Sequence, residues 1–81
     1  MKVTVTFHSY FRELTGCAQV HEEMREGTRL DELLERLRQR FPKLKPMERS
    51  TLTAVGVEYE SGDYVLKDDD EVSLFPPVQG G

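Results

Sequence analysis

Cysteine is almost absent from this sequence, and tryptophan is missing altogether. The single cysteine, Cys17, has no second cysteine with which to form an internal disulfide. One thiol together with His8 and His21 also cannot supply the four ligands of a structural zinc site. These shortages exclude a disulfide-rich scaffold and a zinc-stabilised domain, and they predict a protein of a reducing compartment.

Long apolar runs are missing too. No run approaches the roughly 20 residues that span a bilayer, and residues 1–6 alternate polar with apolar side chains instead of forming the core of a signal peptide. We therefore expect a cytoplasmic protein that is made in its mature form and has no membrane partner.

Basic residues are fewer than acidic residues. The chain has 11 Lys and Arg against 15 Asp and Glu, and its net charge of −4 argues against binding to a nucleic-acid backbone. The negative balance is compatible with docking on a basic groove of a protein partner. At 81 residues the chain is also too short for a two-lobed enzyme with a cleft, although its 37% hydrophobic residues suffice for one core.

In the first half of the chain, apolar periodicity predicts two strands and a helix. Strict alternation over residues 2–8 predicts a strand, weaker alternation over 18–24 predicts a second, and 10–14 is expected to form a short helix or turn. An amphipathic helix is predicted to follow an N-cap at Thr28 and to stop at Pro42. Its apolar positions are Leu30, Leu33, Leu34, Leu37 and Phe41.

The second half predicts more strands. After a loop over residues 42–50, a strand is expected to place Val55, Val57 and Tyr59 on one face. A short extended piece over 64–66, an acidic turn and a last strand over 71–75 are expected to follow. This order predicts an α+β fold, a roll of the β-grasp or ubiquitin-like kind, in which a mixed sheet packs against one main amphipathic helix. We expect the domain to cover residues 1–75 and an extended tail to cover 76–81.

Few residues have the surroundings that catalysis or metal binding requires. His8 and His21 fall at polar strand positions, and Cys17 has no adjacent cation to stabilise a thiolate. The acidic run over 68–71 lacks the spacing of a calcium loop and is interpreted as a turn that faces solvent. We expect no metal site, no permanently bound cofactor and no active site of the protein's own.

The most informative stretch is the end of the chain, Phe75-Pro76-Pro77-Val78-Gln79-Gly80-Gly81. The two prolines hold the preceding residues away from helical angles, so the tail is expected to project from the sheet and to reach roughly 15–18 Å beyond Pro77. The terminal glycines leave the carboxylate without neighbouring side chains, which suits entry into a narrow tunnel. The tail therefore predicts chemistry that another protein's active site performs on the C-terminal carboxylate.

This ending resembles that of the small, sulfur-carrying subunits of molybdopterin synthase, a family within the MoaD/ThiS group of ubiquitin-like proteins. Residues 11–16, 40–42 and 70–72 add to the similarity, which extends over essentially the whole chain. The chain departs from the family where Gly56 stands in place of a frequent Asn and where Asp69 stands in place of a frequent Gly. The second departure requires Asp69 to adopt a turn conformation that aspartate tolerates.

The resemblance implies a function for the tail. An E1-like enzyme would use ATP to convert the Gly81 carboxylate to an acyl-adenylate, and a sulfur donor would turn it into a thiocarboxylate. Within a heterotetramer, the tail would insert into the large catalytic subunit and give its sulfur to cyclic pyranopterin monophosphate. The inserted residues would be Pro76, Pro77, Val78, Gln79 and Gly80 ahead of Gly81, with Phe75 and Val78 as exposed apolar contacts.

Other functions remain open at this point. The chain could be a protein modifier that is conjugated to lysines through Gly81, or a sulfur carrier for tRNA thiolation or thiazole synthesis. The Phe-Pro-Pro-Val segment disfavours thiazole synthesis. A β-grasp interaction module with an inert tail is the remaining alternative.

Overall fold

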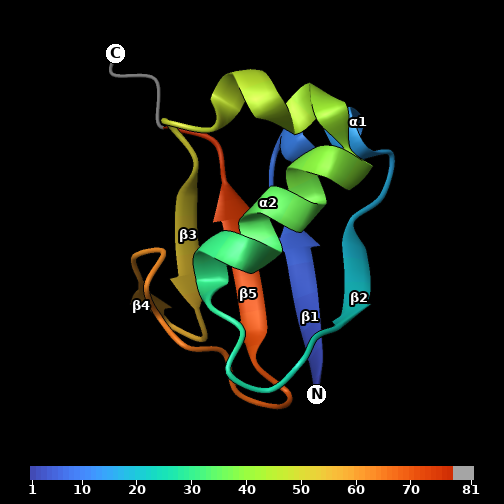
Figure 1. The fold of residues 1–81 in the computed structure, drawn as a ribbon. Coiled ribbons are helices and arrows are strands. Elements are labelled where there is room, and N and C mark those ends of the chain that lie inside the picture. Colours follow the sequence, from blue (N-terminus) through green and yellow to red (C-terminus); the bar gives the residue numbers. More distant parts are fainter. Residues whose placement is uncertain (78–81) are drawn as a thin grey trace.

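A mixed sheet of five strands, with one long helix across one of its faces, makes up most of the computed structural model, which describes residues 1–77 (Figure 1). This arrangement confirms the β-grasp roll predicted from the sequence. The elements are β1 (Lys2–Phe7), α1 (Phe11–Thr15), β2 (Gln19–Glu23), α2 (Leu30–Arg40), the 3₁₀ helix η1 (Pro42–Met47), β3 (Leu52–Val55), β4 (Glu58–Tyr59) and β5 (Glu71–Phe75).

The first and last strands lie side by side in the middle of the sheet. The strand order is β2-β1-β5-β3-β4, and β1 pairs with β5 in parallel while the other pairs are antiparallel. Thr4 of β1 is opposite His21 on one side and Glu71 on the other. The chain beyond β5 therefore leaves from the centre of the sheet, at the end where α1 and η1 lie (Figure 1).

The core lies between the sheet and α2, because one face of each strand and one stripe of the helix are apolar. Val3 and Val5 are completely buried, as are Leu33 and Leu37 of α2, and Phe11 of α1 closes one end. Full burial of an aliphatic or aromatic side chain contributes about 1.5–3 kcal/mol. No helix formed by residues 1–77 covers the opposite face of the sheet, and we call it the open face (Figure 1).

The predicted N-cap at Thr28 is wrong. Helix α2 begins at Leu30, and the Thr28 hydroxyl donates a hydrogen bond to the Arg25 carbonyl. The first amides of α2 are satisfied by a distant loop, because Leu30 N–H donates to the carbonyl of Tyr64 and Asp31 N–H to that of Gly62. Backbone carbonyls from the folded chain thus replace the side-chain cap that the sequence suggested.

The segment predicted as a loop over residues 42–50 contains η1. Pro42 occupies its first position, where proline's fixed φ is favourable. Leu44 is only 4% exposed and holds η1 against the core. The extended piece predicted over 64–66 is not a strand, since it contributes only a single bridge between Arg29 and Val65.

The single strand predicted from Leu52 to Tyr59 is interrupted. Gly56 turns the chain with a φ of 61°, a left-handed value that glycine adopts without strain. Its N–H donates to the carbonyl of Glu71, and β4 returns antiparallel to β3. Val57 and Tyr59 are consequently 95% and 70% exposed, so the prediction that they share a face with the buried Val55 is wrong.

Candidate functional site

The candidate site begins where β5 ends. Phe75 is the last residue of the strand, and Pro76 and Pro77 follow outside any helix or strand, both half-buried. The other predicted tail residues, Val78, Gln79, Gly80 and Gly81, lie outside the described residues. The structure therefore describes the site at the base of the tail, from Phe75 to Pro77.

Phe75 is held at this base by a histidine from the first strand's end. The rings of His8 and Phe75 are stacked, with centroids 4.2 Å apart and planes at 14°. His8 also donates its backbone N–H to the carbonyl of Leu74, which extends the β1–β5 pairing by one step. Because one side of its ring is covered, Phe75 is half-buried, and its predicted role as a freely exposed contact is corrected to a partly covered one.

An apolar surface extends from Phe75 across the open face. Leu52 stands directly opposite Phe75 and is 41% exposed, while Tyr59 stands opposite Ala54, which is two residues further along β3. Directly opposed residues on neighbouring strands, and residues two apart on one strand, share a face. Leu52, Tyr59 and Phe75 therefore lie on one face of the sheet, and we call these three residues the open-face patch. Leu52 and Phe75 lie next to the tail, whereas Tyr59 lies two strands from Phe75, toward the opposite end of the sheet.

Sequence reasoning missed Leu52 and Tyr59 as members of this surface. The available signal was Gly56-Val57 between two strand-like segments, which is a short hairpin connection. Placing a turn there reverses the chain, so that Tyr59 pairs with Ala54. The same register puts Tyr59 on the open face, away from Val55 and the core.

The remaining side chains singled out from the sequence are not brought together. His21 is exposed on the open face, where its Nδ1 lies 3.1 Å from the Thr4 hydroxyl. Cys17 is half-buried, and its Sγ lies 3.8 Å from the hydroxyl of Thr15. Over residues 1–77, no three His, Cys, Asp or Glu side chains are arranged to hold a metal ion.

The acidic run has a structural role at the other end of the sheet. Asp68 accepts a hydrogen bond from the Lys2 amide, and Asp70 accepts one from the Lys67 amide and another from the Tyr64 hydroxyl. Asp69 has a φ of 68°, which confirms the turn conformation expected of it. Partial burial raises the pKa of the Tyr64 hydroxyl above its usual value, and the hydrogen bond to Asp70 raises that pKa further.

Two hollows in the described part of the chain, of about 460 Å³ beside Glu35 and Arg38 and about 300 Å³ beside Thr28 and Arg36, are open to solvent and lined mostly by charged side chains. The hollow nearest the tail is much smaller. This hollow lies between α2, η1 and β5, is lined mainly by Phe11, Leu37, Leu44 and Leu74, and has about 10 Å³ of room. Substrate pockets are on the order of 300–1,000 Å³. Within the described residues, no helix has the length and apolar character needed to cross a membrane.

The fold and its tail base define the class of protein: a ubiquitin-like β-grasp domain that presents its C-terminal residues from the end of a central strand. The chain belongs to the ThiS family, whose model matches residues 5–81. The family resemblance proposed from residues 75–81 is thereby confirmed.

Two relatives illustrate this membership, and a third similarity concerns the fold alone. The chain is 27% identical to the molybdopterin synthase sulfur carrier subunit of Arabidopsis thaliana, over all of this chain and 84% of that protein. It superimposes with a TM-score of 0.88 on a Pyrococcus furiosus protein assigned as molybdopterin converting factor, subunit 1, with 35% identity over 96% of this chain and 99% of that one. It also matches a chain in the complex of subunits 1 and 2 of molybdopterin-converting factor from Helicobacter pylori, with 24% identity, full coverage of both chains and a TM-score of 0.70.

Proposed function

We propose that this protein is the sulfur carrier subunit of molybdopterin synthase in molybdenum cofactor biosynthesis. The observation that carries the proposal is the passage of central strand β5 directly into Phe75-Pro76-Pro77, ahead of a diglycine end, in a member of the ThiS family. The sulfur acceptor is cyclic pyranopterin monophosphate, held by the large subunit. The domain's part is to carry one activated carboxylate to that site.

The chemistry takes place on Gly81. A carboxylate is a poor electrophile, so an E1-like enzyme first joins one of its oxygens to the α-phosphate of ATP and releases pyrophosphate. A sulfur nucleophile then attacks the acyl carbon, and AMP leaves with that oxygen. Where that nucleophile is the terminal sulfur of a persulfide, a thiol then reduces the acyl disulfide, forms a disulfide with the donor and leaves Gly81 as a thiocarboxylate. In the large subunit this sulfur bonds to a carbon of the pterin precursor and displaces an oxygen substituent, and water cleaves the acyl–sulfur bond, which returns Gly81 to a carboxylate.

Partners provide the catalytic groups in this proposal. The described side chains include three pairs of a hydroxyl with a base: Thr4 with His21, Ser61 with Asp63 and Tyr64 with Asp70. The first two pairs are exposed to solvent, and the third holds the acidic turn, so none has the surroundings of an activated nucleophile. The carrier itself holds no resident cofactor, and ATP is consumed by the activating enzyme. We place both steps in the cytoplasm, where the lone thiol Cys17 stays reduced.

The open-face patch is the surface that we propose for docking on the large subunit. Leu52 and Tyr59 are large apolar side chains with substantial exposure; Leu52 lies directly opposite Phe75 at the tail base, and Tyr59 extends the same face to strand β4. Clustered exposed apolar side chains are typical of protein interaction sites. Docking there would bring Pro76 and Pro77 to the mouth of the large subunit's pocket, within the heterotetramer typical of this family.

An intact-mass measurement tests the proposal. Incubation with the E1-like enzyme, ATP and a sulfur donor is expected to raise the mass by the difference between one sulfur and one oxygen atom. A variant that lacks Gly81 is the matched control and is expected to keep its mass. An unchanged wild-type mass, with enzymes that activate another carrier in parallel, would contradict the proposal.

A genetic test separates the alternatives. The gene is expected to restore molybdopterin synthesis in a strain without its own carrier, and to leave a strain without the thiazole carrier unrescued. Diglycine remnants of this protein on lysines of cellular proteins, without rescue of molybdopterin synthesis, would favour a protein modifier instead.

A further inference from the structure

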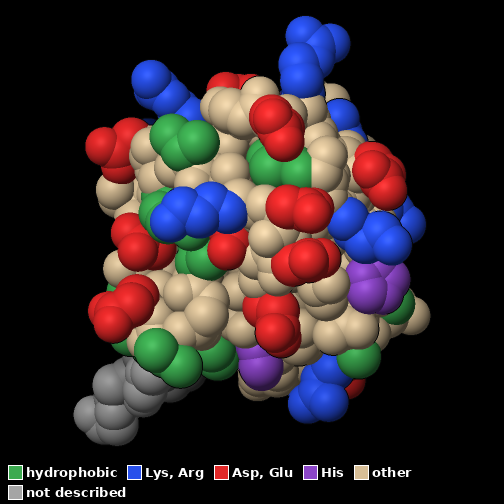
Figure 2. Space-filling view, turned by 90° about the horizontal axis from the view of Figure 1, so that it is seen from below, with side chains coloured by type: hydrophobic (Ala, Val, Ile, Leu, Met, Phe, Trp, Pro, Cys, Tyr) green, Lys and Arg blue, Asp and Glu red, His purple; other side chains and the backbone are tan. Residues whose placement is uncertain are grey.

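Charge is unevenly distributed over this acidic protein. The acidic side chains concentrate in the segment from Gly56 to Glu71, which crosses the end of the sheet opposite the tail (Figure 1). Figure 2 looks at this end and shows many acidic side chains across it, interspersed with Lys and Arg side chains. The segment has one basic residue, Lys67, against Glu58, Glu60, Asp63, Asp68, Asp69, Asp70 and Glu71.

One segment at the tail end of the molecule has an excess of basic residues. Between α2 and β3 the chain carries Lys43, Lys45 and Arg49, all exposed, and we call these three side chains the basic edge. Glu48 is the one acidic residue among them, and it pairs with Arg38 at 3.2 Å. Neither the two lysines nor Arg49 forms an ion pair with another residue in the described range.

The fold presents the basic edge beside the tail. Leu44 is buried, so the flanking Lys43 and Lys45 are turned to solvent. Arg49 precedes Leu52 by three residues, and Leu52 is paired with Phe75. Three residues of chain span at most about 11 Å, so Arg49 lies close to the point where the tail departs.

We infer that the basic edge is a docking surface for an acidic protein surface, located around the entrance through which the large subunit receives the tail. The inference rests on the proposed function and extends it by fixing the sign of the partner's charge at that place. The overall charge of −4 alone is compatible with a basic partner groove, but seven of the 15 acidic residues lie in the segment from Gly56 to Glu71, at the far end. Approach with the tail foremost would bring the basic edge, not the acidic end, to the partner.

A protein partner fits better than nucleic acid. Strong binding to a phosphate backbone takes on the order of 6–10 neutralised phosphates, whereas this edge offers three cations on an acidic protein. Three cations are sufficient to steer a protein encounter, because complementary charge acts mainly on the association rate.

The test measures association of the whole carrier with the isolated large subunit by stopped-flow at low and high salt. Lys43→Glu with Lys45→Glu is expected to lower the association rate constant about tenfold at low salt. The difference should nearly vanish at about 1 M salt, where charges are screened within about 3 Å. The dissociation rate constant is expected to change less than the association rate constant.

The matched control is Lys2→Glu with Lys67→Glu. It alters net charge by the same amount, at exposed lysines of the acidic end, and is expected to have a much smaller effect. Equal slowing by both double variants, or faster association of the Lys43 and Lys45 variant, would overturn the inference while leaving the proposed function intact. Retention of the wild-type protein on a short DNA duplex, lost in the Lys43 and Lys45 variant, would overturn it in favour of nucleic acid. Absence of binding by the wild-type carrier, together with an unchanged mass in the activation assay, would refute the proposed function and the inference with it.

Discussion

His8 and Phe75 form a parallel ring stack, 4.2 Å between centroids, that joins the end of the first strand to the end of the last. The two residues follow directly from the parallel register of β1 and β5, in which Phe7 is opposite Leu74. Pro76 comes next in the chain, so the stack fixes the place from which the tail leaves the domain. His8 Nε2 is buried there and forms no hydrogen bond with the described residues.

Replacement of Phe75 is expected to weaken docking more than folding. Phe75→Ala removes an aromatic side chain from the centre of the proposed interface, and such anchors are worth about 1–4 kcal/mol in binding. We expect the Kd for the large subunit, measured by calorimetry, to rise at least about tenfold. Because Phe75 is half-exposed, its loss should lower the free energy of unfolding by only about 1–2 kcal/mol.

His21→Ala is the control for this variant, because His21 also lies on the open face but belongs to the outer strand β2. It is expected to change the Kd by less than about twofold relative to wild type, as substitutions outside the hot spot of an interface do. Equal Kd values for wild type and Phe75→Ala would place the docking surface elsewhere.

Substitutions at two leucines are expected to distinguish effects on stability from effects on docking. Leu37 lies on the buried side of α2 and is fully buried, so Leu37→Ala is expected to lower the free energy of unfolding by about 2–5 kcal/mol. Leu52 is 41% exposed on the open face, and Leu52→Ala is expected to lower it by less than about 1.5 kcal/mol while raising the Kd for the large subunit. Urea unfolding and calorimetry measure the two quantities, and a Leu52 variant that unfolds as easily as the Leu37 variant would contradict the assignment.

Local periodicity was enough to predict the fold, whereas the role of the tail stays a prediction. Strand β1 and helix α2 have regular apolar spacing over whole elements, and residues 75–81 carry their signal in consecutive positions. The errors fall where distant segments decide the outcome. The start of α2 is capped by the carbonyls of Gly62 and Tyr64, which no pattern near Thr28 reveals.

The open-face patch and the basic edge depend on strand order for the same reason. Leu52 and Phe75 are far apart in sequence and become neighbours only because β3 pairs with β5. Arg49 is brought beside the tail by that same pairing. The sequence alone therefore predicted a reactive carboxylate at Gly81, which stays a prediction, whereas the surfaces around the tail base required the sheet topology.

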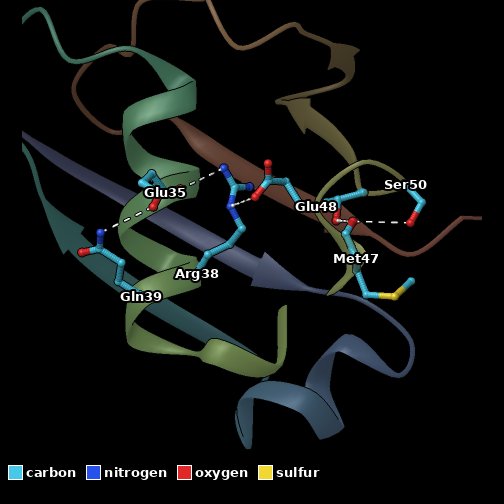
Figure 3. Close-up of polar contacts among 7 residues, drawn as sticks. Glu35, Arg38, Gln39, Met47, Glu48 and Ser50 are labelled. Carbon is cyan, nitrogen blue, oxygen red and sulfur yellow. Dashed lines mark hydrogen bonds and ion pairs between the residues drawn. The ribbon is translucent and has the colours of Figure 1, made fainter. Parts of the chain in front are cut away.

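Arg38 is predicted to tie α2 to the segment that follows η1. Its Nε lies 3.2 Å from a Glu48 oxygen and its Nη2 lies 3.4 Å from a Glu35 oxygen (Figure 3). Nε makes no hydrogen bond to the described residues, so its attraction to Glu48 is that of an ion pair. We expect Arg38→Met to lower the free energy of unfolding by about 0.5–1 kcal/mol, since the carboxylates are half-exposed.

A double-mutant cycle with Glu48→Gln checks this prediction by urea unfolding. The coupling between the two changes should be about 0.2–1 kcal/mol and should shrink in high salt. A coupling of zero would show that Arg38 acts through packing of its aliphatic part alone.

Tyr64 is predicted to make stability depend on pH in the alkaline range. Its pKa is raised by partial burial and then by the bond to Asp70, so the folded protein holds the phenolic proton more tightly than the unfolded chain does. The resulting contribution to stability is complete below the unfolded pKa of about 10 and is lost as pH rises through the higher folded pKa. Tyr64→Phe should remove this loss of stability at high pH. In a spectrophotometric titration of this variant, the tyrosine component that ionises at the higher pH should be missing. Asp70→Asn should shift that component toward lower pH, and an unmoved titration curve would disprove the role of Asp70.

Asp69 is predicted to be a position where glycine is better than the native residue. Its φ of 68° is a left-handed conformation, which costs roughly 1–2 kcal/mol for a residue with a Cβ. Glycine avoids that cost but loses about 0.5–1 kcal/mol through the greater freedom of the unfolded chain. Asp69→Gly is therefore expected to raise the free energy of unfolding by about 0.5–1 kcal/mol, and the melting temperature by several degrees.

Asp69→Ala distinguishes backbone strain from charge repulsion in the acidic turn. It removes the same carboxylate as Asp69→Gly but keeps a Cβ at the left-handed position, so it is expected to give no gain in stability. Thermal unfolding of the two variants at low and high salt measures the difference. If both variants were stabilised equally and high salt abolished the gain, repulsion with Asp68 and Asp70 would be the cause. If Asp69→Gly alone were stabilised at both salt concentrations, the backbone conformation would be the cause, as the φ value requires.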